Sequence, residues 1–384
     1  MTSKQFAIRL IVGCLILLGL VGIFNRIVDP FWYYRDIEID GFNAVKHKFQ
    51  RFERHVKPAL LIREQPEAII LGSSFSEVGF DPNNPFFTNH GRLKSMNFAL
   101  AGASWERNQC DFEFAVTHSR IKRALVGFHP GDLPLADCEK DFASLGQISA
   151  GTLLFSDRSL LASIQTIWEQ RDGLRSHTRE GMYFYSRHAA GVDNRFRKYF
   201  MARIKENPQC MKPGDKSHVD SNPDAQHELD LSGLRRMIRT AKKHNVELVL
   251  FAYPRHAYNF EMDRQCDEAG WQWHALQKIA SMVKTESAGN ESVRAWHFYG
   301  YNDITAEPIG TSAKYWQDPN HFNFEMGNWM LEDMFDESHA PPKLGRPLAS
   351  GSTDSIYREF LAQRDGYMKQ HMEIQQDFQK LLPK

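Results

Sequence analysis

The stretch Ala68-Ile69-Ile70-Leu71-Gly72-Ser73-Ser74 decides the fold of this chain of 384 residues. Its apolar run predicts a short strand that is buried on both faces, as strands of a parallel sheet are. Gly72 ends the strand, and we expect a helix to begin directly after it. The two serines therefore fall on a strand-to-helix turn at the carboxyl edge of the sheet, where open α/β folds bind their ligands.

The same alternation of strand and helix continues along most of the chain. Helical patterns at Leu231–His244 and Trp271–Lys284 separate further short apolar runs. The candidate strands lie at 95–99, 124–128, 246–252 and 294–298. This order predicts an α/β fold of three layers, with a parallel sheet of the flavodoxin-like kind and helices on both of its faces.

We assign residues 67–340 to this α/β domain. The interval of about 135–230 shows no clear strand, so we expect an insertion of helices and loops over the carboxyl edge of the sheet. Residues 341–384 predict a linker rich in Pro, Gly and Ser, followed by an amphipathic helix. That helix can pack on its own domain or against a partner helix.

The amino-terminal segment predicts a membrane anchor. An apolar run extends from Phe6 to Val28, and the long side chains of Arg9 and Arg26 can reach the two interfaces. A cleaved signal peptide is the alternative, but no small-residue cleavage site follows the run. We therefore assign 1–30 to a cytoplasmic tip and a transmembrane helix, and 31–66 to a membrane-proximal helical segment.

The charges near this segment indicate its orientation. Lys4 and Arg9 precede the uncharged part of this run, Leu10–Phe24, and positive charge is retained on the cytoplasmic side. The sequence thus predicts a single-pass protein of the bacterial inner membrane, with a cytoplasmic amino terminus and a periplasmic domain. The 47 basic and 47 acidic residues balance, which argues against a nucleic-acid-binding protein.

The chain has five cysteines, and their number is compatible with export. Cys14 lies in the apolar run, and Cys110, Cys138, Cys210 and Cys266 remain. These four allow three complete pairings, and the sequence does not choose among the pairings and free thiols. None shows C-x-x-C spacing, so we predict no metal site, and no motif calls for a cofactor.

A second motif supplies the groups that a reactive serine needs. Asp318-Pro319-Asn320-His321 precedes a helical pattern at 325–335. His321 would take the proton of the Ser74 hydroxyl, which is a poor nucleophile at its ordinary pKa. Asp318 would orient the imidazole and stabilise its protonated form. The alternatives are a serine that only caps a helix and a loop histidine beside a capping aspartate.

These motifs resemble those of the SGNH (GDSL-type) hydrolase superfamily. That family carries Gly-Asp-Ser on its first strand-to-helix turn, where this chain has Gly72-Ser73-Ser74, and Asp-x-x-His near its carboxyl end. The block Asn97–Ser104 resembles the one whose glycine completes the oxyanion hole. The resemblance therefore implies that the amides of Ser74 and Gly102 are oxyanion donors.

One block departs from the family pattern. The resemblance runs from about 67 to 335, and within it the family usually has Gly-x-Asn-Asp after the third strand. This chain reads Gly127-Phe128-His129-Pro130-Gly131-Asp132 at that place. Either His129 replaces the missing asparagine as an oxyanion donor, or the amides of Ser74 and Gly102 act alone. The likeness is therefore closer to membrane-anchored relatives, such as the D-alanyl transfer protein of teichoic-acid synthesis and the alginate O-acetylation proteins.

The likeness to these relatives implies a function. They work beside a multi-spanning membrane O-acyltransferase, so we expect serine-dependent acyl transfer, in particular of acetyl, or ester hydrolysis on a cell-surface polysaccharide. The expected partners are that polysaccharide or an acyl carrier, the membrane enzyme and the inner membrane. One alternative is a catalytically silent SGNH scaffold that binds glycan or assembles a polysaccharide secretion or acylation complex. Another is a plain periplasmic lipase or esterase.

Four further residues are candidates for substrate binding. Arg255 and His256 end the fourth candidate strand, where they could hold a sugar hydroxyl or carboxylate. Trp105 and Trp316 flank the expected site and could stack on sugar rings. A surface turn explains the first pair equally well, and core packing explains the second.

Overall fold

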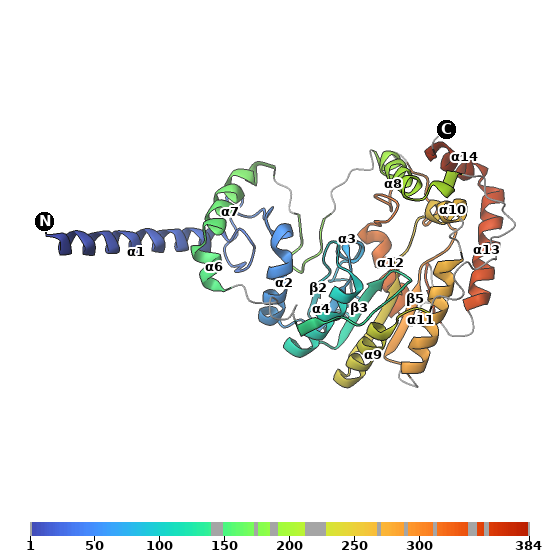
Figure 1. Ribbon diagram of the computed structural model, residues 1–384, viewed down its shortest axis with the longest axis horizontal. Helices are drawn as coiled ribbons and strands as arrows, with labels where there is room; N and C mark the ends of the chain where they lie inside the picture. The colour runs from blue at the N-terminus through green and yellow to red at the C-terminus, as the bar shows by residue number, and fades with distance from the viewer. Residues whose placement is uncertain are drawn as a thin grey trace. The chain divides into compact units, whose positions relative to one another are not determined.

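The computed structural model describes residues 2–139, 149–172, 176–184, 191–211, 228–266, 270–287, 291–309, 313–336, 344–348 and 353–382. The chain forms two compact units, and Figure 1 labels most of their helices and some of their strands. The first unit combines residues 1–65 with 138–184, and the second combines 66–137 with 185–384. Part of the interval 135–230 therefore groups with the amino-terminal segment.

The second unit is built on a six-stranded sheet in the order β2-β1-β3-β4-β5-β6. Its parallel strands are β1 (Ala68–Leu71), β2 (Ser95–Asn97), β3 (Arg123–Phe128), β4 (Glu247–Ala252) and β5 (Val293–His297). They lie where the sequence predicts them, which confirms the α/β class and the mostly parallel sheet. The short β6 (Arg346–Pro347) pairs antiparallel with β5, in a stretch where the sequence predicts only a linker.

The second unit contains amphipathic helices, which bury an apolar face. Helix α9 (Ser232–His244), for example, buries Leu234, Met237 and Ile238, as expected for an amphipathic helix. The other helices of this unit are α3 (Ser74–Gly79), α4 (Trp105–His118), α8 (Val192–Glu206), α10 (Ala257–Gln265), α11 (Trp271–Ser287), α12 (Phe324–Phe335), α13 (Thr353–Gln370) and α14 (Met372–Leu381), with a 3₁₀ turn η2 (Pro208–Met211).

The carboxyl-terminal segment forms two helices, α13 and α14, rather than one. Both pack on the second unit itself. Arg364 of α13 donates two hydrogen bonds of 2.7 Å to the carboxylate of Glu261. Phe378 of α14 lies with its ring centroid 5.8 Å from that of Phe200.

The first unit contains α1 (Ser3–Val28), α2 (Phe49–Glu64), α6 (Ala150–Phe155), α7 (Asp157–Trp168) and a 3₁₀ turn η1 (Glu169–Asp172). Helix α1 is long and apolar enough to cross a membrane. Its side chains from Thr2 to Leu20 are exposed, whereas Gly22, Asn25 and Val28 near its end are buried.

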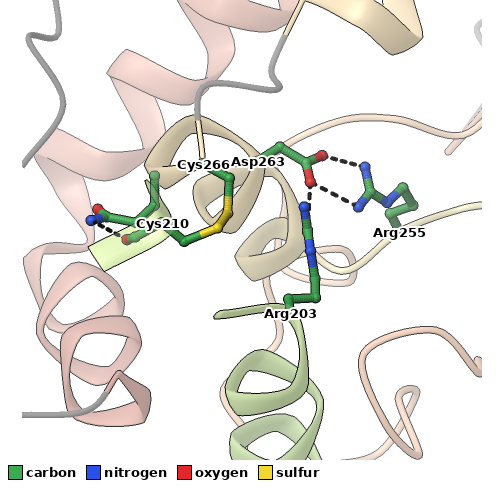
Figure 2. The surroundings of a disulfide bond; sticks show 6 residues. Arg203, Cys210, Arg255, Asp263 and Cys266 are labelled. Atoms are coloured by element: carbon green, nitrogen blue, oxygen red, sulfur yellow. Dashed lines mark hydrogen bonds and ion pairs between the residues drawn. A yellow bond between two sulfur atoms is a disulfide. The ribbon is translucent and has the colours of Figure 1, made fainter. Parts of the chain in front are cut away.

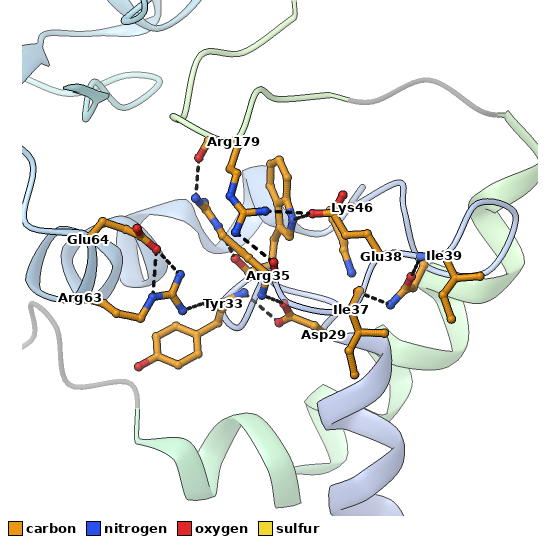
Figure 3. Close-up of polar contacts among 12 residues, drawn as sticks. Asp29, Tyr33, Arg35, Ile37, Glu38, Ile39, Lys46, Arg63, Glu64 and Arg179 are labelled. Carbon is orange, nitrogen blue, oxygen red and sulfur yellow. Dashed lines mark hydrogen bonds and ion pairs between the residues drawn. The ribbon is translucent and has the colours of Figure 1, made fainter. Parts of the chain in front are cut away.

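Residues 29–48 of this unit form a series of turns, where the sequence predicts helix. The left-handed backbone of Asp29, Trp32 and Arg35 breaks any helix there. Polar contacts hold the turns in place (Figure 3). The Asp29 carboxylate accepts the N–H groups of Tyr33 at 2.8 Å and Arg35 at 2.9 Å, and Lys46 Nζ donates to the Val28 carbonyl at 2.7 Å.

A disulfide joins Cys210 of η2 to Cys266 at the end of α10 (Figure 2). The sequence left the pairing of these cysteines open. Cys110 and Cys138 are also disulfide-bonded. Cys14 of α1 is a free cysteine.

Helices α12 and α3 of the second unit pack closely against each other. A Cβ placed on Gly327 would overlap the carbonyl oxygen of Gly79. Gly327→Ala should therefore lower the free energy of unfolding by about 1–3 kcal/mol, the usual cost of overpacking. A lower melting temperature of the full chain in detergent would measure it.

The matched control is Gly366→Ala in α13, where a Cβ would meet nothing within 4 Å. The free energy of unfolding of this variant should be unchanged or higher than that of the parent chain, because alanine has a higher helix propensity than glycine at an exposed helical position. Equal melting temperatures for the two variants would contradict the packing described here.

Candidate active site

The turn between β1 and α3 is built so that only glycine fits at its centre. Gly72 has φ of +145°, and a Cβ there would overlap Ser76 Oγ and Tyr253 Oη. The chain therefore turns sharply after Leu71, and Ser74 becomes the first residue of α3. The side chain of Ser74 is half-buried at this edge of the sheet.

The buried phenol of Tyr253 supports this turn from below. Its hydroxyl accepts the N–H of Ser73 at 2.8 Å and lies 3.2 Å from Ser76 Oγ. Burial raises the pKa of Tyr253, so the phenol stays neutral. The sequence patterns do not predict a role for Tyr253, although its position directly after β4 places it at the same edge of the sheet as Ser74.

Asn97 fixes the other end of α3. Its side chain is fully buried, and Nδ2 donates to the carbonyls of Ser76 and Phe80, both at 3.0 Å. Its Oδ1 accepts the N–H of Ala99 at 3.2 Å. One amide thus ties the helix that carries Ser74 to the loop that follows β2.

Hydrogen bonds to its backbone hold the loop that carries Asp318 and His321 in one conformation. The N–H of Gln317 donates to the His321 carbonyl at 2.9 Å. Asn259, which is fully buried, donates from Nδ2 to the Pro319 carbonyl at 2.6 Å. The loop leads into α12, whose contact with α3 brings the loop beside Ser74.

Ser74, His321 and Asp318 form a continuous chain of hydrogen bonds. Ser74 Oγ lies 2.8 Å from His321 Nε2, although the two residues are 247 positions apart. His321 Nδ1 lies 2.9 Å from both carboxylate oxygens of Asp318. The sequence predicts this grouping from two separate motifs, and the structure brings all three side chains together.

The Asp318 carboxylate remains ionised in this arrangement. Burial alone would raise its pKa, but the hydrogen bonds and charge of His321 and the backbone N–H groups of Asn320 and His321 outweigh burial and lower it. A negative Asp318 fixes the proton of His321 on Nδ1 and leaves Nε2 to accept the proton of the Ser74 hydroxyl.

An aromatic side chain holds the imidazole ring in place. Phe75 stacks on His321 with ring centroids 4.9 Å apart and an interplanar angle of 19°. The ring of Tyr253 also stacks on Phe75, at 4.7 Å and 25°. The residue next to the serine thus links the histidine to the tyrosine that supports the turn.

Among the described residues, no acceptor is found for the backbone N–H of Ser74, at the start of α3, or for that of Gly102, in the loop after β2. Gly102 is exposed and has φ of +68°, a conformation that favours glycine. The N–H of Leu100 donates to the Gly72 carbonyl at 3.1 Å and so holds the Gly102 loop against the serine turn. Both amides are therefore available to a ligand at this edge.

His129 follows β3 at the same edge. Its ring lies edge-on to Phe75, with centroids 5.0 Å apart, and 4.8 Å from the ring of Tyr253. Partial burial of the imidazole lowers the pKa of His129, and the positive charge of Arg255 lowers it further. The residue as a whole remains exposed to solvent. The ring contacts Phe75 and Tyr253, and no hydrogen bond joins it to the described residues.

Three of the four residues expected to bind substrate are buried, and Arg255 is half-buried. Trp105 is 9% exposed and Trp316 is 2% exposed, and Trp316 Nε1 donates to the Ile304 carbonyl at 2.7 Å. His256 is inaccessible to solvent and caps α10, and burial lowers its pKa to about 3. Arg255 is paired with Asp263 near the disulfide (Figure 2). Trp105, Trp316 and His256 therefore pack inside the protein, whereas the side chain of Arg255 stays partly exposed.

Comparisons with protein-family models and with curated proteins identify no relative of the chain.

The support of the serine turn by Tyr253 can be tested with Tyr253→Phe. The variant leaves the Ser73 N–H buried without its acceptor, which costs about 1–3 kcal/mol of unfolding free energy. Thermal unfolding of the full chain should show this loss.

Tyr367→Phe is the matched control, because its hydroxyl donates to Asp303 at an exposed position 3.1 Å away. We expect little change there. A Tyr253→Phe chain as stable as the control would mean that the phenol does not support the turn.

Proposed function

We propose that the chain transfers an acyl group through Ser74, as an acyltransferase or an esterase. The observation that carries this proposal is the hydrogen-bond chain from Ser74 through His321 to Asp318. Such a chain activates a hydroxyl that is otherwise a poor nucleophile. The buried supports of each member, Tyr253 and Asn97 on one side and Asn259 on the other, hold it ready before substrate arrives.

In the first step, Ser74 Oγ attacks the carbonyl carbon of an ester while His321 Nε2 takes the hydroxyl proton. The charge of Asp318 stabilises the imidazolium that forms. The tetrahedral intermediate then expels the alcohol, which takes the proton back from His321. The products of this step are a free alcohol and an acyl ester on Ser74.

The negative oxygen of the intermediate needs hydrogen-bond donors. We assign this role to the amides of Ser74 and Gly102, because neither has an acceptor among the described residues and the Leu100–Gly72 hydrogen bond joins their two loops. His129 contacts Phe75 and belongs to the wall of the site. This arrangement supports an oxyanion hole made of two amides, without the asparagine of the resembling family.

In the second step, His321 removes a proton from water or from a saccharide hydroxyl, and that oxygen attacks the acyl-Ser74 carbonyl. Ser74 leaves with the proton that His321 returns. Water gives hydrolysis, and a saccharide gives transfer. The same residues serve both outcomes, so the acceptor determines which reaction is observed.

The resemblance to SGNH hydrolases supplies the rest of the proposal. The mostly parallel sheet, with the serine after β1 and the Asp-x-x-His motif before α12, is compatible with a three-layer SGNH fold. We assign α1 to the bacterial inner membrane, with its amino terminus in the cytoplasm and both units in the periplasm. The acyl group is acetyl and the acceptor a cell-surface polysaccharide, beside a multi-spanning O-acyltransferase.

Substitution of the serine tests the chemistry. The full chain in detergent should release nitrophenol from p-nitrophenyl acetate, and Ser74→Ala should lower turnover by roughly 10⁴-fold or more. Ser287→Ala is the matched control, because its hydroxyl bonds only the nearby Lys284 carbonyl at the surface. Turnover that survives in Ser74→Ala would exclude this serine as the nucleophile.

A cellular measurement separates an enzyme from a scaffold, since a strict transferase can be slow on a small ester. In a strain with Ser74→Ala, acetylation of the surface polysaccharide should fall while the protein level stays constant. Normal acetylation in that strain would support the silent scaffold instead.

A further inference from the structure

Helix α7 in the first unit exposes large apolar side chains, which a helix of a water-soluble protein normally buries. Leu161, Ile164 and Trp168 are 60%, 53% and 69% exposed. Their spacing of three and four residues places them on one face of the helix. An apolar stripe of this kind on the outside of a protein marks a surface that is covered by something other than water.

The buried face of α7 is made of small and polar residues. Ser159, Ala162, Ser163 and Thr166 are buried, which is the reverse of the pattern in α9. Ser163 Oγ donates to Asn25 Oδ1 of α1 at 2.8 Å. Small residues and polar bonds between helices, with apolar side chains outside, are the arrangement of helices that pack within a membrane.

The partner of α7 and α6 is the end of α1. Asn25 Nδ2 donates to the Leu154 carbonyl of α6 at 2.8 Å. A Cβ on Gly22 would overlap the ring of Phe155, which is itself 46% exposed. Figure 1 shows α6 and α7 beside the last turns of α1. The exposed apolar surface of α1 continues to Ile23, so it reaches the level of these contacts.

The length of α1 places these contacts at the membrane boundary. A hydrocarbon core of about 30 Å needs about 20 helical residues at roughly 1.5 Å each. The uncharged run from Leu10 to Phe24 supplies only about 22 Å at that rise. The bilayer must therefore extend to the very end of this run, where Gly22 and Asn25 contact α6 and α7.

We propose that the exposed face of α7, together with Phe155, lies in the interface of the lipid bilayer that α1 crosses. This inference depends on the membrane insertion of α1 proposed above. The occupant is lipid because the face continues the apolar surface of α1 and ends in Trp168, a residue type enriched at membrane interfaces. Helix α7 then lies along the membrane and limits the tilt of the first unit.

Lipid quenching of a fluorescent label tests the proposal on the full chain. Ile164→Cys and Leu161→Cys, each in a Cys14→Ser background, are labelled with nitrobenzoxadiazole without reductant so that the disulfides persist. The chain with native Cys14 labelled is the control for α1, and Lys243→Cys on the charged face of α9 is the control for water exposure. All are reconstituted in phosphatidylcholine–phosphatidylglycerol vesicles, with and without lipids that carry a nitroxide on the acyl chain.

We expect the labels at 164 and 161 to lose fluorescence in nitroxide lipid as the label at Cys14 does, while the label at 243 keeps its fluorescence. Quenching at Cys14 but not at 164 and 161 would overturn the placement of α7 and leave the insertion of α1 intact. Protection of 164 and 161 from both nitroxide lipid and aqueous iodide would also overturn it, in favour of a second copy or another protein. No quenching at Cys14 would instead refute the insertion of α1.

Discussion

The contact between α3 and α12 is the constraint on which the site depends. Gly327 lets α12 approach the carbonyl of Gly79 so closely that no side chain fits between them. Ser74 begins α3, and the loop of Asp318 and His321 leads directly into α12. The close packing of these two helices therefore sets the distance between the serine and the histidine. The hydrogen bond of 2.8 Å between them is its result.

Much of the fold could be predicted from the sequence, because buried parallel strands are short apolar runs. The five parallel strands lie within a residue or two of the expected positions. Strand β6 was missed, since its two residues include Pro347 and have no apolar pattern. Turns at 29–48 were missed as well, because they depend on left-handed residues and buried polar contacts that have no periodicity.

The three residues at the centre of the site could be predicted, whereas the residues around it could not. Asp318 and His321 are neighbours in the sequence, and Ser74 is placed by the strand-to-helix turn. Tyr253 acts through a backbone N–H that lies 180 positions away, and no local pattern reveals such a contact. Trp105, Trp316 and His256 were expected to face substrate, but aromatic residues near a sheet edge fill the core equally well.

Each of the two units contributes a different feature to the proposed function. The second carries the reactive group, and the first carries an apolar helix together with a second apolar face at its end. In the proposed function, such a membrane tether would raise the local concentration of Ser74 near the membrane.

The most direct measurement is the formation of a covalent adduct on Ser74. The full chain is incubated with a fluorophosphonate, and the modified residue is identified by peptide mass spectrometry. A serine activated through His321 should carry the adduct, and His321→Gln should slow its formation by on the order of 10³-fold or more. No adduct on Ser74, or equal rates in the parent chain and His321→Gln, would contradict the proposal that this hydrogen-bond chain activates a nucleophile.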